Sequence, residues 1–155
     1  MSRTLVIQRG RTVPLDTRQL RQIAATLLGE LLALEDYELG IHLVRAPEMT
    51  RINQAFLQHE GSTDVITFNH ANHPADLHGE LFICYDVALA QAREYRTLWT
   101  SEIVRYVVHG VLHLQGFDDH RATDRRKMKR EETRLLRQLS RRFPISKLAP
   151  PRPPT

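Results

Sequence analysis

The 155-residue chain is 41% hydrophobic and 26% charged, which is typical of a single soluble domain with enough apolar residues for a core. One cysteine, Cys84, excludes a disulfide framework, and the lack of a secretory signal or a long apolar run predicts a cytoplasmic protein with no membrane partner. The net charge of +4 and pI of about 9.6 favour a polyanionic partner.

The first half of the chain predicts two strands, each followed by a helix. Residues 4–8 are expected to form the first strand, and helical spacing of apolar residues predicts a helix over 17–34 with Asp16 at its start. Residues 37–45 predict the second strand, and a second helix begins near Pro47. Its buried face is expected to carry Met49, Ile52 and Phe56.

The second half predicts two more strands and three helices. The segments 63–68 and 79–84 are rich in β-branched and aromatic residues and are expected to be strands. Helices are expected over 86–96, 100–114 and 122–142. The helix over 100–114 is so apolar that it should lie at the centre of the core.

This order of elements predicts an α/β chain of the α+β type: one domain, in which helices pack against a small mixed four-stranded sheet. The domain is expected to comprise residues 1–142. Residues 143–155 end in LAPPRPPT and are expected to form a disordered, proline-rich tail.

The segment HGVLHLQGFDDH has the residue types of a metal site. His109 and His113 are four positions apart, so both imidazoles project from one helix face, as two nitrogen ligands of a transition metal would. Gly116 can end the helix, and the chain then turns back to bring one of the next few residues over that face as a third ligand. Three protein ligands leave a coordination position for water, as in catalytic sites.

The segment HGVLHLQGFDDH resembles the signature H-G-x-L-H-L-x-G-[YF]-D-H of the YbeY family of bacterial metal-dependent endoribonucleases. The resemblance covers most of residues 45–140 in family order. Its further motifs are Ile52-Asn53, Thr63-Asp-Val-Ile-Thr-Phe68, Gly79-Glu80, and Met128 with Glu132.

The sequence departs from the family pattern at two positions. Asp119 occupies the place of the family's third histidine, and His120 follows one position late. We favour Asp119 as the third ligand, because a carboxylate can bind zinc and the turn sets which side chain points at the metal; His120 is the alternative. Leu57 replaces an arginine that contacts RNA in the family, and His59 or basic residues elsewhere could compensate.

The resemblance implies a zinc-dependent hydrolase that cleaves single-stranded RNA in ribosomal RNA maturation and ribosome quality control, with the small ribosomal subunit as partner. His109 and His113 would act through a metal-activated water, and another divalent metal could replace zinc. Asp64 and Glu80 could supply a base or orient a ligand. Gly110 follows His109 where H-E-x-x-H proteases have their general base, which argues against a peptidase.

The last predicted helix is strongly basic. It contains nine Lys and Arg residues, with Arg121 just before it, and only three acidic ones. Such a run is often only a solvated face, but it is also typical of phosphate contacts. The candidate RNA-binding residues are Arg125, Arg126, Lys129 and Arg130.

Two alternatives to the nuclease remain open from sequence. One is a non-catalytic, ribosome-associated RNA-binding factor with a structural metal. The other is a small metallohydrolase or peptidase with a non-nucleic substrate.

Overall fold

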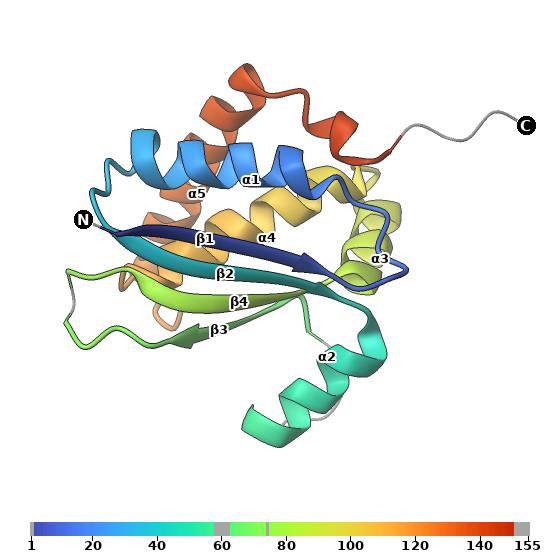
Figure 1. Cartoon of the computed structure of the whole chain (residues 1–155), viewed down its shortest axis with the longest axis horizontal. Helices are drawn as coiled ribbons and strands as arrows, with labels where there is room; N and C mark the ends of the chain where they lie inside the picture. The colour runs from blue at the N-terminus through green and yellow to red at the C-terminus, as the bar shows by residue number, and fades with distance from the viewer. Residues whose placement is uncertain (1, 58–62, 74, 151–155) are drawn as a thin grey trace, which may run out of the picture.

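The computed structural model describes residues 2–57, 63–73 and 75–150 and shows a mixed sheet with helices on both of its faces (Figure 1). The strands are β1 (Arg3–Arg9), β2 (Tyr37–Val44), β3 (Val65–Asn69) and β4 (His78–Cys84). The helices are α1 (Thr17–Thr26), α2 (Ala46–Ile52), α3 (Tyr85–Tyr95), α4 (Trp99–Leu114) and α5 (Ala122–Arg142). The predicted α+β fold is confirmed.

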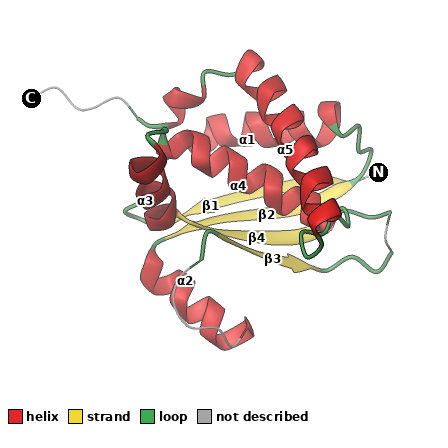
Figure 2. Cartoon of the chain, turned by 180° about the vertical axis from the view of Figure 1, so that it is seen from behind, coloured by secondary structure: helices red, strands yellow, loops and turns green. Residues whose placement is uncertain are grey.

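The sheet has the strand order β1-β2-β4-β3, in which β1, β2 and β4 are parallel and β3 is antiparallel to β4. Helices α1, α4 and α5 lie on one side of the sheet and α2 on the other, in both views (Figures 1 and 2). Because side chains alternate along a strand, Ile41 and Leu81 point into the helical layer, where both are fully buried.

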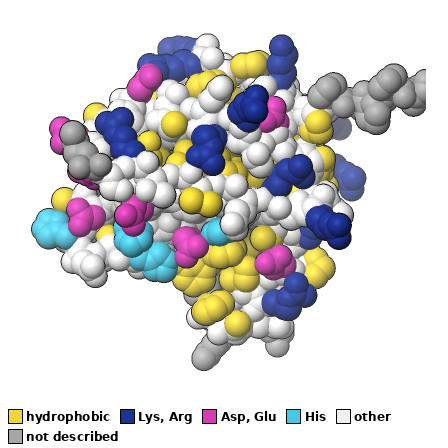
Figure 3. Space-filling view, in the orientation of Figure 1, with side chains coloured by type: hydrophobic (Ala, Val, Ile, Leu, Met, Phe, Trp, Pro, Cys, Tyr) yellow, Lys and Arg dark blue, Asp and Glu magenta, His cyan; other side chains and the backbone are white. Residues whose placement is uncertain are grey.

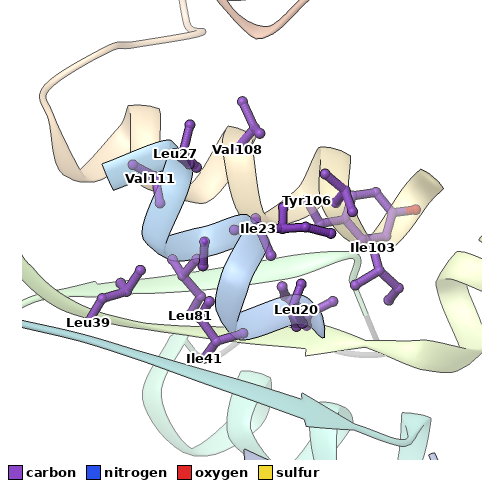
Figure 4. Packing of buried hydrophobic residues seen from close by; sticks show 14 of the residues in the cluster. Leu20, Ile23, Leu27, Leu39, Ile41, Leu81, Ile103, Tyr106, Val108 and Val111 are labelled. Atoms are coloured by element: carbon purple, nitrogen blue, oxygen red, sulfur yellow. The ribbon is translucent and has the colours of Figure 1, made fainter. Parts of the chain in front are cut away.

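The core lies between the sheet and helices α1 and α4 (Figure 4). Leu20 and Ile23 of α1 meet Leu81 of β4 there, and all three are at most 1% exposed. Gly110 lets α4 approach β4 closely, since a Cβ atom at that position would lie 2.6 Å from Leu81 Cδ2. Within the described chain, no helix has the length and apolar character that crossing a bilayer requires.

The helix predicted over 17–34 is α-helical only as far as Thr26. Its start is as expected, because the Asp16 carboxylate accepts hydrogen bonds from the backbone N–H groups of the first turn. Residues Leu27–Leu31 form a wider π-helical turn, in which the N–H of Leu32 bonds to the carbonyl of Leu27, five residues back.

The expectation that Phe56 lies on a buried helix face is wrong. Met49 is fully buried, but Phe56 is 67% exposed. The chain continues after α2 as a π-helical segment, Asn53–Leu57, and its wider turn changes the phase of the spacing that placed Phe56 beneath Ile52.

The packed chain also extends beyond the expected boundary at residue 142. A 3₁₀ helix, Ile145–Leu148, follows α5, and Leu148 is fully buried with its carbonyl 2.9 Å from the Asp16 N–H. Leu148 is apolar enough to pack, so the proline content around it does not prevent order. Residues 151–155 lie outside the described residues, and their expected disorder stays a prediction.

Candidate metal centre

The two histidines of the motif lie one turn apart on α4 and face the same way. The Nε2 atoms of His109 and His113 are 3.1 Å apart, and the ring centroids are 4.6 Å apart. Their side chains are 30% and 26% exposed, so the pair lies at the edge of the core where solvent can reach it.

The turn after α4 both ends the helix and orients His113. Gly116 has a φ of 98°, and the N–H groups of Gly116 and Phe117 bond to the carbonyls of His113 and Leu112, each at 3.0 Å. This pattern is a Schellman motif, whose left-handed residue is normally glycine. The carbonyl of Phe117 then lies 3.1 Å from His113 Nδ1 and accepts a hydrogen bond from it.

The same turn brings Asp119, rather than His120, to the histidine pair. Asp119 Oδ2 lies 3.5 Å from His113 Nε2 and 3.9 Å from His109 Nε2. The His120 side chain is 87% exposed and its Nε2 lies 3.5 Å from Asp118. Arg125 donates hydrogen bonds to the carbonyls of Asp119 and His120, which ties this loop to α5.

A buried carboxylate of α5 orients the other histidine. Glu132 is 4% exposed, and its Oε2 accepts a hydrogen bond from His109 Nδ1 at 3.0 Å. Burial opposes the ionisation of Glu132, but the bond from His109 and the charge of Lys129 outweigh it, so the pKa of this carboxyl lies below its usual value. Glu132 is therefore a charged acceptor that fixes the His109 tautomer.

These contacts make His109 Nε2, His113 Nε2 and Asp119 Oδ2 suitable metal ligands. With both Nδ1 atoms donating, the Nε2 atoms of His109 and His113 face each other at 3.1 Å, an arrangement in which both lone pairs could bind one cation. Two atoms that each bind a tetrahedral ion at ~2.1 Å lie ~3.4 Å apart. The two Nε2 atoms are 3.1 Å apart, and Asp119 Oδ2 lies 3.5 and 3.9 Å from them, so the three separations are close to that value. The donor set of His109, His113 and Asp119 could hold a metal ion.

A pocket of about 330 Å³ opens beside these residues. Its lining carries both signs of charge: Arg105, Arg125 and Lys129 are basic, and Asp64, Asp119 and Glu132 are acidic. Asp64 Oδ1 accepts a hydrogen bond from the Val65 N–H at 2.7 Å. The structure thus places Asp64 at the pocket, and its chemical role stays a proposal.

Glu80 does not belong to this site, and its expected role there is corrected. Residues 79 and 81 of β4 face α4, so the alternation of the strand turns Glu80 to the opposite face of the sheet. There its carboxylate lies 3.0 Å from both His70 Nε2 and His42 Nε2, whose hydrogen bonds lower its pKa. Figure 3 shows histidine and acidic side chains gathered on this part of the surface.

The four candidate RNA-binding residues divide between two places on α5. Arg125 and Lys129 line the pocket, whereas Arg126 and Arg130 line a neighbouring groove that also includes Lys129. His59 lies outside the described residues, so its expected compensation for Leu57 stays a prediction.

Sequence reasoning gave Glu132 no function beyond its place in a family motif. A signal was present, because Glu132 occupies the apolar stripe of α5 with Met128 and Leu135, and a carboxylate is seldom buried without a partner. The Phe117 carbonyl could not be found this way, since backbone groups leave no mark in a sequence.

The fold and the site define an α+β protein with a candidate mononuclear centre of two histidines and one carboxylate, beside a pocket lined by basic and acidic side chains. The chain belongs to the YbeY family: the family model described as Endoribonuclease YbeY matches residues 6–140.

Relatives and a solved structure agree with this assignment. A protein named Endoribonuclease YbeY from Chlorobium luteolum is 43% identical over 59% of this chain, and one from an Anaeromyxobacter strain is 36% identical over 83%. The matches span 66% of the length of each of these two relatives. The solution structure of a Thermotoga maritima protein, 23% identical, superposes with a TM-score of 0.70 over 97% of this chain and 100% of that one, which shows the shared fold.

Proposed function

We propose that the chain is a zinc-dependent endoribonuclease that hydrolyses single-stranded RNA. The observation that carries the proposal is the convergence of His109, His113 and Asp119 beside a pocket lined by Arg125 and Lys129, in a member of the YbeY family. A zinc ion bound there would lower the pKa of a coordinated water from its bulk value to about 7 and would stabilise charge on a phosphate.

The residues of the pocket divide the remaining work among themselves. His109, His113 and Asp119 would hold the ion, while Glu132 and the Phe117 carbonyl accept hydrogen bonds from the two Nδ1 atoms and leave the Nε2 lone pairs to face it. Lys129 and Arg125 line the pocket and would bind the phosphate, as point charge and planar donor respectively.

We assign Asp64 as the candidate that orients or deprotonates the attacking water, because it is the pocket carboxylate that contacts neither histidine. Tyr106 does not suit that role. Burial raises the pKa of its hydroxyl well above the usual value, so the group keeps its proton at neutral pH.

The family resemblance also implies the biological setting, which we include in the proposal. The substrate would be ribosomal RNA of the small subunit, in maturation and ribosome quality control. A protein with one cysteine needs no disulfide and suits the reducing cytoplasm. A peptidase is disfavoured, since Gly110 packs against Leu81 in the core and leaves no space for a glutamate base.

The test is cleavage of a labelled single-stranded oligoribonucleotide by wild type, His113→Ala and the control His120→Ala. Wild type and the control should cleave internally, lose activity with chelator and regain it with zinc, whereas zinc should not restore His113→Ala. Cleavage that survives complete chelation would contradict the proposal. RNA binding without cleavage by any preparation would instead favour the binding factor.

A further inference from the structure

Five arginines form one exposed stripe along α5. Arg126, Arg130, Arg134, Arg137 and Arg141 follow one another at intervals of three or four residues, which places them on one helix face. They line a groove of about 630 Å³. The opposite stripe, with Met128, Leu135 and Leu139, is buried in the core and holds the arginine face outward.

Most of this positive charge has no acidic partner. Arg134 pairs with Glu131, but Arg126, Arg130, Arg137 and Arg141 form no ion pair with any residue of the described chain. Like charges at i, i+4 repel one another and destabilise a helix. A polyanion in the groove would relieve this repulsion.

The groove is continuous with the candidate metal centre. Lys129 lines both the groove and the pocket, and its Nζ lies 3.6 Å from Glu132, the partner of His109. From Arg126 to Arg141 the helix rises about 22 Å, at ~1.5 Å per residue. A chain whose phosphate enters the pocket can therefore continue along α5.

We propose that this arginine groove is an exosite for the sugar–phosphate backbone of the RNA strand on one side of the cleaved bond. The inference rests on the proposed function, and it adds that efficient cleavage needs a flanking segment several nucleotides long. The groove is lined only by Arg, Lys, Thr and Gln side chains, so it has no aromatic ring for a base to stack on. It contacts phosphates without reading sequence and has no apolar side chain to insert into a lipid surface.

The test compares Arg137→Gln/Arg141→Gln, at the far end of the groove, with Arg18→Gln/Arg93→Gln, which removes the same charge elsewhere. Binding of a 20-nucleotide 2′-O-methyl oligouridylate is measured by fluorescence anisotropy from about 50 to 200 mM salt. Each lost phosphate contact lowers the log–log salt slope by ~0.7, so the groove variant should lose ~1.4. Between about 50 and 200 mM salt, the factor by which its affinity falls should then be about sevenfold smaller than the factor for wild type. The control variant should keep the wild-type slope.

Cleavage supplies the second readout. The groove variant should cleave a 20-nucleotide RNA more slowly at low substrate concentration, and a four-nucleotide RNA at the wild-type rate. Equal salt slopes in both double variants, or no measurable binding of the 20-mer, would overturn the exosite. So would tighter, Arg137-dependent binding of an acidic peptide or of anionic vesicles. A reduced slope without cleavage by any preparation would support the exosite and contradict the proposed function, so the two failures are distinguishable.

Discussion

Substitution of Glu132 should weaken metal binding although this residue is not a proposed ligand. Its buried carboxylate accepts the His109 Nδ1 hydrogen at 3.0 Å and so keeps Nε2 free to bind. Loss of such a partner typically reduces metal affinity by ~10–100-fold. Each factor of ten corresponds to about 1.4 kcal/mol.

Two variants separate the effect of the Glu132 charge on metal affinity from the effect of its hydrogen-bond acceptor. Glu132→Gln keeps the volume and an acceptor oxygen but loses the charge, so we expect a loss near tenfold. Glu132→Ala removes the acceptor too, so the His109 ring is free to carry its hydrogen on Nε2 instead of Nδ1. We therefore expect metal affinity to fall by a factor near one hundred. Glu131→Gln is the matched control, because Glu131 is the adjacent residue but bonds to Arg134.

The assay is competition for zinc between metal-free protein and a chromophoric chelator at pH 7. Thermal melts of the same metal-free proteins show whether each variant is folded. If folded Glu132→Ala binds zinc within twofold of wild type, the role assigned to this carboxylate is refuted.

Two further predictions concern stability. Gly79→Ala should lower the free energy of unfolding by ~1–3 kcal/mol, because its Cβ would lie 2.6 Å from the backbone oxygen of Phe68. The control Gly29→Ala, whose Cβ has ordinary space, should be neutral or stabilising. Equal urea midpoints for the two variants would refute this prediction. The hydrogen bond from Arg45 holds the pKa of Asp86 below its ordinary value of 3.8, so the pair stabilises the fold above that pH and stops doing so as pH falls through the folded-state pKa. Asp86→Asn should therefore lose less stability than wild type between pH 7 and pH 3 in urea titrations, and parallel losses would contradict the assignment.

The parts of the fold that follow local patterns could be predicted from sequence. The i, i+4 spacing of His109 and His113 and the glycine after them define a helix and a turn, and both are local. The choice between Asp119 and His120 also follows from the turn, since Gly116 sets the direction of the next residues.

The errors arose where tertiary structure decides the outcome. Which face of the sheet receives Glu80 depends on the helices covering the other face, and the pairing of Glu132 with His109 depends on how α4 and α5 pack. Phe56 was misplaced because the sequence does not reveal that the turn after α2 widens. Leu148 belongs to a segment that packs against α4 and against α1, which is more than a hundred residues earlier in the chain.

The most direct test of the central claim is the metal content of purified protein, measured by elemental analysis after dialysis against zinc. Wild type and His120→Ala should each retain one zinc per chain, and Asp119→Ala and His113→Ala should retain far less. Retention by Asp119→Ala with loss from His120→Ala would contradict the ligand set, and wild-type protein that retains no zinc or other divalent metal would contradict the metal centre itself.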